Sequence, residues 1–267
     1  MSSEVLNVAR EAAAAASVFI REIRSSGAID LSFKGARNLV TAADVGAERI
    51  IIEKIRARFP DHHILAEESA PTIDATDYLK PLWIIDPVDG TTNFAYGSPQ
   101  VGISIAFADR GTTEVGVVAA PFQDEEFVAV RGEGAQLNGR SIRASKVTSL
   151  EETLVCTGFP YSRSDLDLLM RQFRTMLAQC ADMRRFGACS LDLCWVACGR
   201  IDAYYETVAT WDMAAGALIA REAGARVGQI FPKPSDCPIP DDLYPRDMLV
   251  SAAGVFDQLL PLLRNPL

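Results

Sequence analysis

Two carboxylates within residues 83–94 are the strongest chemical signal in this sequence. An apolar run leads directly into Asp86, and Asp89 follows three residues later. We expect Pro87 to fix a turn between them and Gly90 to free the backbone, so that both side chains face one point. Carboxylate oxygens arranged in this way favour a metal site, whereas Asp and Gly alone are equally typical of ordinary turns.

The residues after these carboxylates favour the binding of an anion. Gly90 and Thr91 are expected to begin a short helix, and the free N–H groups at a helix N-terminus attract phosphate and other anions. The segment therefore predicts a metal site beside a phosphate site.

Two other segments carry acids that could join this site. Glu67 and Glu68 follow the apolar run 64–66, and adjacent strand residues point to opposite faces, so we expect only Glu67 to share the site. Asp212 follows Trp211 at the start of an alanine-rich helix. A solvated surface would also explain the paired glutamates, and a helix cap would equally explain Asp212.

These residues resemble the inositol monophosphatase family of magnesium-dependent, lithium-sensitive phosphatases. The resemblance covers roughly residues 34–224, and a chance match of five ordered motifs is remote. The last forty or so residues carry little of it. The motifs are residues 39–44, 64–69, 83–94, 185–206 and 211–224.

The resemblance implies a set of metal ligands. Asp86 would bridge two ions, and Glu67, with Asp44 reaching the ion or its water, would support a third, weaker one. The segment 34–44 is one residue shorter than in the animal enzymes, which leaves a flap role for Lys34 open. The implied ligands are Glu67, Asp86, the carbonyl of Val88, Asp89 and Asp212.

The resemblance also implies catalytic and substrate-binding residues. Glu67, Thr91 and Asp44 would be catalytic, with Thr91 and Asp44 polarising the attacking water. Glu206 indicates a polyol substrate, because a carboxylate accepts hydrogen bonds from neighbouring hydroxyls, although an exposed acid after a strand is the alternative. The implied substrate contacts are Asp89, Gly90, Thr91, Cys189, Glu206 and Asp212.

The ligand chemistry indicates the cofactor and the reaction. Oxygen ligands with one carbonyl suit Mg²⁺, whereas Zn²⁺ prefers nitrogen or sulfur. We expect two or three Mg²⁺ ions and hydrolysis of a small phosphate monoester, most simply inositol monophosphate, by metal-activated water. Histidinol phosphate, fructose 1,6-bisphosphate and 3′-phosphoadenosine 5′-phosphate are alternative substrates. A regulatory protein that binds a macromolecular partner through the same fold is a second class of function.

Composition narrows the class of protein. A chain of 267 residues that is 49% hydrophobic and 23% charged is expected to fold as a globular protein. With a net charge of −9 and no long basic run, we expect no nucleic acid as a partner. The family resemblance implies a small phosphorylated polyol as the partner. The uncharged stretch 12–20 is too short to cross a membrane.

Cysteine usage indicates the compartment. The six cysteines form no C-x-x-C pair, so we expect reduced thiols in a cytoplasmic protein. Family resemblance implies a homodimer.

The site residues must be positioned by elements that the hydrophobic pattern locates. Residues 101–141 predict an antiparallel meander with a hairpin turn at Asn138 and Gly139, and residues 229–244 a proline-rich surface loop. We expect short strands at 63–66, 82–85, 202–206 and 248–251. Helices are predicted over 3–24, 42–59, 164–179, 187–199 and 211–223, with a further one at the end of the chain.

Together these elements predict an α/β fold. The family resemblance implies a layered αβαβα sandwich of the inositol monophosphatase or sugar phosphatase type. We expect an N-terminal α+β half, residues 1–146, and a C-terminal α/β half, residues 147–267, which together form one catalytic unit.

Overall fold

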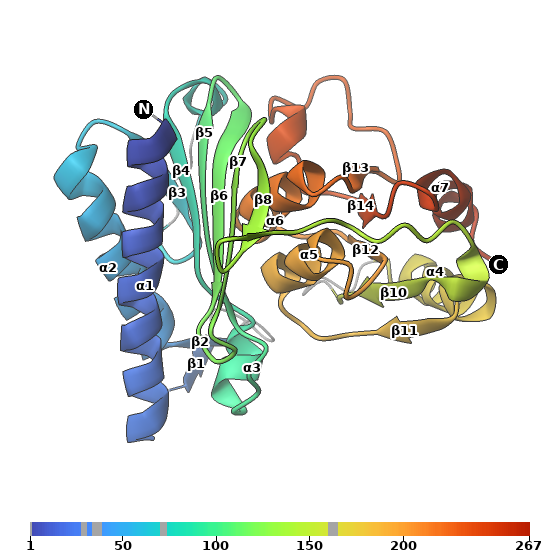
Figure 1. The fold of residues 1–267 in the computed structure, drawn as a ribbon, viewed down its shortest axis with the longest axis horizontal. Helices are drawn as coiled ribbons and strands as arrows, with labels where there is room; N and C mark the ends of the chain where they lie inside the picture. The colour runs from blue at the N-terminus through green and yellow to red at the C-terminus, as the bar shows by residue number, and fades with distance from the viewer. Residues whose placement is uncertain (1, 28–30, 34–38, 70–73, 160–164) are drawn as a thin grey trace.

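The computed structural model shows a layered arrangement of helices and sheets (Figure 1). Helices α1 (Ser2–Ser26) and α2 (Ala42–Arg58) cover one face of the first sheet, and α5 (Cys189–Ala197) and α6 (Thr210–Glu222) lie between the two sheets. Helices α4 (Leu166–Gln179) and α7 (Phe256–Arg264) cover the outer face of the second sheet. The expected αβαβα order is confirmed. The structure describes residues 2–27, 31–33, 39–69, 74–159 and 165–267, so Lys34 lies outside the described residues.

The first sheet contains the predicted meander. Its strands follow one another in sequence order, and all neighbours are antiparallel except β3 and β4, which run parallel. Because β3 and β4 are parallel, their carboxyl ends meet at one edge of the sheet. The strands are β3 (His63–Ala66), β4 (Leu82–Asp89), β5 (Gly102–Asp109), β6 (Thr112–Ala120), β7 (Glu125–Val130), β8 (Gly134–Leu137) and β9 (Arg140–Ser141).

Strand β4 carries the first pair of site carboxylates. It is buried along its whole length, and its register with β5 shifts between the pair of Asp86 with Ser104 and the pair of Asp89 with Gly102. Pro87 therefore lies inside β4 and not in a turn, which corrects the sequence-based expectation. Proline has no N–H to donate to a neighbouring strand, so it fits where the hydrogen-bond ladder is interrupted.

The second sheet has the order β11-β10-β12-β14-β13. The predictions included β12 and β14 but not the other three strands, which are also short, and of which β11 and β13 lack an apolar run that marks them as strands. Strands β10, β11 and β12 are parallel, and β14 runs antiparallel to β12 and β13. The bounds are β10 (Leu154–Thr157), β11 (Asp182–Arg184), β12 (Ala203–Glu206), β13 (Arg226–Gln229) and β14 (Met248–Ser251).

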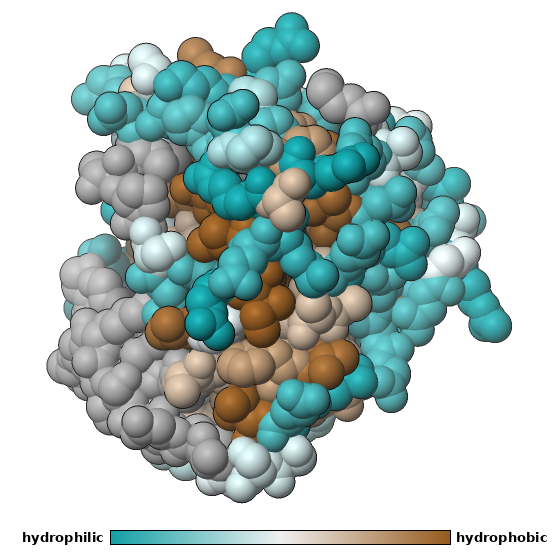
Figure 2. All heavy atoms as spheres, turned by 90° about the vertical axis from the view of Figure 1, so that its left-hand side faces the viewer, coloured by the Kyte–Doolittle hydropathy of each residue, from teal (hydrophilic) through white to brown (hydrophobic). Residues whose placement is uncertain are grey.

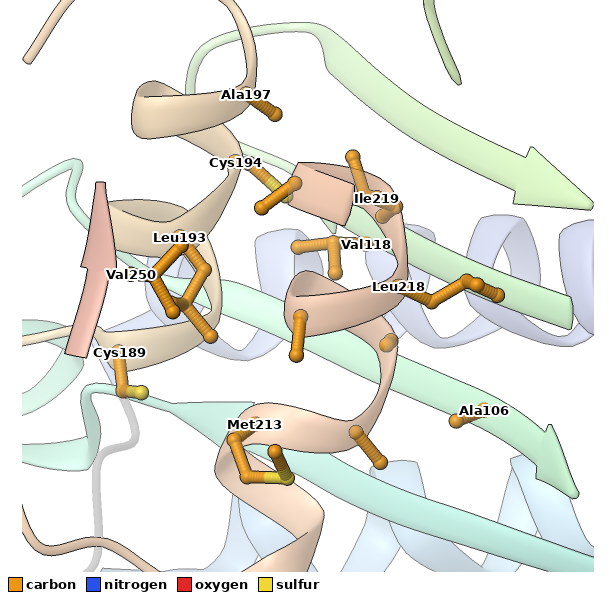
Figure 3. Packing of buried hydrophobic residues seen from close by; sticks show 14 of the residues in the cluster. Ala106, Val118, Cys189, Leu193, Cys194, Ala197, Met213, Leu218, Ile219 and Val250 are labelled. Atoms are coloured by element: carbon orange, nitrogen blue, oxygen red, sulfur yellow. The ribbon is translucent and has the colours of Figure 1, made fainter. Parts of the chain in front are cut away.

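Small residues let the helices approach their neighbours closely. On α1, the face that packs inward carries Ala9, Ala12, Ala13 and Ala16, all buried. Between the sheets, Cys194 of α5 lies near Ile219 of α6 and Val118 of β6, whereas Leu218 points away from α5 within the same hydrophobic cluster (Figure 3). This central layer joins residues from both sides of position 146 in one hydrophobic cluster. The division into two halves stays a prediction.

The outer helical layer is amphipathic. On the side of α1 and α2, Figure 2 shows hydrophilic residues at the top and right and apolar residues gathered in a band down the middle. Val18 on α1 and Val45 on α2 are more than half exposed. None of the described helices is long and apolar enough to cross a membrane.

The connections complete the chain. The segment 229–244 is largely irregular, as expected, but Ile230 and Leu243 are fully buried within it, so it is more than a surface loop. All six cysteines are free thiols. The remaining elements are β1 (Leu31–Phe33), β2 (Leu39–Thr41), α3 (Thr91–Ala95), η1 (Asp77–Leu79), η2 (Leu150–Glu152) and η3 (Asp241–Leu243).

Candidate active site

The turn from β4 into α3 places carboxylates and backbone amides side by side. Asp89 ends β4, Gly90 has a φ of +88°, and Thr91 begins α3. A side chain at position 90 would be strained by this φ, and its Cβ would lie 2.9 Å from the carbonyl oxygen of Gln100. Glycine is therefore required here, because the backbone both turns sharply and packs against another segment.

A cavity of about 320 Å³ opens at this turn. It is lined by elements of both sheets and of the central helical layer, so residues far apart in the sequence share it. Every predicted site residue except Asp44 lies in its wall. The acids that line it are Glu67 after β3, Asp86 and Asp89 in β4, Asp192 in α5, Glu206 at the end of β12 and Asp212 in the first turn of α6.

Of the two paired glutamates, Glu67 lies at this cavity and Glu68 does not. The amide of Glu68 instead donates a hydrogen bond of 2.7 Å to the carboxylate of Glu48 on α2. The placement of Glu67 in the wall agrees with the expectation from strand geometry, because neighbouring residues leave the strand on opposite sides.

Backbone amides orient three of the carboxylates. Asp86 accepts a hydrogen bond of 3.0 Å from the amide of Val88, and Asp212 accepts one of 2.8 Å from the amide of Ala209. Asp89 accepts two bonds at Oδ2, from the amide (2.7 Å) and the hydroxyl (2.5 Å) of Ser190. The last pair ties β4 directly to the first turn of α5.

The carboxylates repel one another in the absence of a cation. Burial raises the pKa of Asp86 well above its usual value, and the charges of Glu67 and Asp89 raise it further. Burial also raises the pKa of Asp89, and it raises that of Asp212 to about 7. Among the described residues that line the cavity, Arg185 is the only cation. A bound divalent ion would relieve this crowding of negative charge.

The donor set fits Mg²⁺. The groups gathered here are carboxylate oxygens and the carbonyl of Val88, and this cation prefers oxygen donors. Among the described residues, no three acidic, histidine or cysteine side chains already form a compact metal-ligand cluster. Residues Glu67, Asp86, Asp89 and Asp212 would supply the carboxylate oxygens that hold the ion.

Asp44 reaches the site through Thr91. The Thr91 hydroxyl lies 2.9 Å from Oδ1 of Asp44 and 3.1 Å from the carbonyl oxygen of Val88. Asp44 is buried in the first turn of α2, behind the cavity wall. The contact joins two of the three residues expected to be catalytic.

Glu206 and Cys189 line the same cavity. Burial raises the pKa of Glu206 to about 7, while a hydrogen bond from Tyr204 and the charge of Arg185 lower it. Cys189 is the first residue of α5 and is buried, and burial raises the pKa of its thiol. These two residues would face the alcohol part of a substrate.

Sequence reasoning did not single out three residues of the site. Asp192 and Arg185 line the cavity, and Ser190 orients Asp89. Helical spacing could have identified Asp192, because it lies three residues after Cys189 and therefore shares the same face of α5.

The comparisons with known proteins agree with the family resemblance of the motifs. The chain matches the inositol monophosphatase family over residues 1–264. It belongs to this family. Nus factor SuhB of Pseudomonas aeruginosa is 43% identical over 228 residues, which cover 84% of each chain. Family membership supports a phosphatase, and the family is generally dependent on Mg²⁺.

Solved structures of family members have the same fold. Extragenic suppressor protein SuhB from Bartonella henselae has a TM-score of 0.89 at 32% identity, and the match covers 99% of this chain and 100% of that one. Inositol monophosphatase from Anabaena (Nostoc) sp. has a TM-score of 0.84 at 34% identity, with 99% and 97% covered.

The expected absence of a nucleic-acid partner is contradicted by these comparisons. Relatives in several bacteria are named Nus factor SuhB, which conflicts with that expectation. The expectation depended on a net charge of −9 and on the lack of a basic run. Net charge governs direct attraction to phosphates, whereas a protein can join a nucleic-acid assembly through that assembly's protein components.

Proposed function

We propose that the chain is a Mg²⁺-dependent phosphatase that hydrolyses a small phosphate monoester, most simply inositol monophosphate. The observation that carries this proposal is the cavity that Glu67, Asp86, Asp89 and Asp212 share with Glu206. The family match and the solved inositol monophosphatase support the same reaction class.

The residues at the carboxylate end would bind the ions and the phosphate. Glu67, Asp86, Asp89, Asp212 and the carbonyl of Val88 would hold two or three Mg²⁺ ions. When bound, these ions supply Lewis-acid activation of the attacking water and offset the negative charge of the phosphate.

The chain's other groups would orient the reactants. The amides of Gly90 and Thr91 would hold the phosphate at the start of α3, and the Thr91 hydroxyl, with Asp44, would orient the attacking water. Glu206 would accept hydrogen bonds from hydroxyls of the alcohol, and the backbone at Cys189 would contact the same part of the substrate.

Phosphate release from the purified protein tests this proposal. The substrates are inositol 1-phosphate, histidinol phosphate, fructose 1,6-bisphosphate and 3′-phosphoadenosine 5′-phosphate, each with and without Mg²⁺. We expect release that requires Mg²⁺, is greatest with inositol 1-phosphate and falls when Li⁺ is added. Faster release from another member of the panel would reassign the substrate, and no release from any of them would refute a phosphatase.

A second function is favoured by the name of the relatives. Because a 43% identical protein is named Nus factor SuhB, we propose that the chain also has a regulatory role, carried by its surface and independent of hydrolysis. The two functions are separable in principle, since the site carboxylates lie inside a cavity.

The variant Asp89→Asn separates the two functions. Asparagine keeps a carbonyl oxygen for the two Ser190 donors but removes the charge, so we expect hydrolysis to fall at least about 100-fold while the fold is retained. In cells that lack the native gene product, a regulatory role would persist with Asp89→Asn and with the exposed control Asp61→Asn. If Asp89→Asn behaves like the deletion, catalysis is the role that matters.

A further inference from the structure

Tyr204 and Glu206 lie on the same side of β12. Side chains two residues apart in a strand point to the same face, and the fully buried Tyr204 donates its hydroxyl proton to Oε2 of Glu206. Tyr205, between them, points to the opposite face and packs in the outer hydrophobic cluster. The strand thus supplies the cavity with a carboxylate and with the group that holds it.

Cys189 of α5 lies next to this pair. Its side chain stands at the start of the helix in Figure 3 and is buried near the Tyr204 hydroxyl, whose single proton goes to Glu206. The three side chains therefore lie together between β12 and α5.

Gly158 closes the other side of Glu206. A Cβ at position 158 would overlap Oε2 and Cδ of Glu206, so the carboxylate rests directly against the glycine backbone. Gly158 is not in the left-handed region, so other residues could adopt its backbone conformation. The missing side chain is therefore needed for space, and it is the carboxylate of Glu206 that fills this space.

We propose that Tyr204 is a positioning residue for substrate selection, which, with Gly158, fixes the Glu206 carboxylate in the orientation that accepts hydrogen bonds from the substrate's hydroxyls. The inference rests on the proposed phosphatase function and names the substrate class as phosphates of polyols. It gives Tyr204 no contact with the reacting atoms.

The physical basis is conformational entropy. A Glu206 side chain that no neighbour holds would lose rotational freedom when the substrate binds. A glutamate side chain has several rotatable bonds, and fixing them on substrate binding costs affinity unless the protein has already done so. The Tyr204 hydrogen bond also lowers the pKa of Glu206, which keeps the carboxylate better suited to accept hydroxyl protons. Loss of a hydrogen bond to a charged group corresponds to an effect of about tenfold on binding.

Tyr204→Phe is the decisive variant. With Mg²⁺ present, we expect KM for inositol 1-phosphate to rise about tenfold and kcat to change less than about twofold. Hydrolysis of p-nitrophenyl phosphate, which has no hydroxyl groups beside the ester, should be unchanged. An equal loss with both substrates, or no change with either, would overturn the proposal.

Tyr205→Phe is the matched control. The Tyr205 hydroxyl is buried and has no hydrogen-bond partner among the described residues, so its removal should leave both substrates and the melting temperature unaffected. Glu206→Gln supplies the double-mutant cycle. If Tyr204 acts through Glu206, adding Tyr204→Phe to Glu206→Gln should change KM less than twofold, whereas additive effects would contradict a shared path.

Gly158→Ala tests the same position from the other side. The tyrosine is intact in this variant, but the new methyl group displaces the Glu206 carboxylate, so KM for inositol 1-phosphate should again rise while p-nitrophenyl phosphate is unaffected. Crystal structures of Gly158→Ala and Tyr204→Phe should both show Glu206 moved. A Glu206 side chain that stays in place in both would overturn the proposal.

The structural readout separates two kinds of failure. Absence of Mg²⁺-dependent phosphate release by the wild-type protein would refute the proposed function. The position of Glu206 in the variant crystals would still decide whether Tyr204 and Gly158 hold it.

Discussion

The Thr91 hydroxyl connects two parts of the site. It lies within hydrogen-bond distance of both Asp44 and the carbonyl oxygen of Val88, although one proton can serve only one of these acceptors at a time. The hydroxyl can therefore donate a hydrogen bond to one acceptor and still accept a hydrogen bond from a water molecule. Such a group suits the orientation of a nucleophile.

Substitution of Thr91 tests this arrangement. Thr91→Val keeps the shape of the side chain but removes the hydroxyl, so we expect kcat to fall roughly 100-fold and the free energy of unfolding to fall by about 1–2 kcal/mol. Thr91→Ser keeps the hydroxyl and should retain most of the activity. Phosphate release and urea unfolding measure the two effects, and equal activity in the two variants would show that the hydroxyl has no part in the reaction.

At the residue scale, the sequence was most informative where acids adjoin apolar elements. Glu67, Asp86 and Asp212 each stand at or near the end of a predicted element, and such ends meet at one edge of a sheet. Asp192 could not be recognised in this way, because the role of a polar residue within an apolar helix depends on which residues surround its side chain in the folded protein. Arg185 precedes α5 in an irregular segment, where no periodicity predicts its direction.

At the element scale, the packing of α5 against α6 sets the separation between two site carboxylates. Asp89 is held by Ser190 of α5, and Asp212 belongs to α6. Gly216 of α6 faces α5 so closely that a Cβ there would lie 2.8 Å from Cβ of Leu193 and 3.1 Å from the carbonyl oxygen of Ser190. Ser190 in turn holds Asp89. Crowding at this helix contact would therefore reach the metal-binding side of the cavity.

Two helical glycines should respond differently to the same substitution. Gly→Ala within a helix normally stabilises by about 1 kcal/mol, but Gly216→Ala should destabilise by about 1–3 kcal/mol because Leu193 and Ser190 leave no room. In Gly46→Ala the new methyl group meets only the end of the half-buried Phe19 side chain, which can move aside by a change at χ1, so we expect no loss of stability. Thermal unfolding of the two variants and the wild-type protein measures these changes in stability.

The site provides a second readout for the Gly216→Ala variant. Because Ser190 would shift, the Mg²⁺ concentration for half-maximal activity should rise in Gly216→Ala and stay constant in Gly46→Ala. Stabilisation of Gly216→Ala, or an unchanged Mg²⁺ requirement, would contradict a tight contact between the helices.

The elements differ in how well the sequence predicts them. Long helices such as α1 and the buried strand β4 have enough residues to show a period, and their predicted positions agree with the structure. Strands β10, β11 and β13 have three or four residues each, and their strand structure depends on neighbours distant in sequence. The irregularity at Pro87 depends on the register with β5, which no local pattern reveals.

At the scale of the whole molecule, buried negative charge makes stability depend on pH. Burial raises the pKa of both Asp212 and Glu206 to about 7. The native state therefore binds protons that the unfolded chain has released, and the free energy of unfolding falls as pH rises from about 4.5 to 7. Each group contributes at most roughly 3–4 kcal/mol to this loss.

Thermal unfolding in a chelator at several pH values tests this dependence. The melting temperature should fall between pH 5 and pH 8, and added Mg²⁺ should raise it most at pH 8, where the carboxylates are ionised. Glu206→Gln removes one titrating group and should flatten the decline. A melting temperature that rises toward pH 8 without Mg²⁺ would contradict the assigned direction of these pKa shifts.

The placement of the cavity between layers also has a consequence for biosynthesis. Glu67, Asp86 and Asp89 belong to the first sheet, whereas Asp212 arrives with α6, after more than a hundred further residues have been translated. A nascent chain that has folded only its meander lacks the fourth acid and the helix that closes the central layer. The complete carboxylate set thus exists only once α6 has docked, which makes tight cation capture a late event in the maturation of the protein.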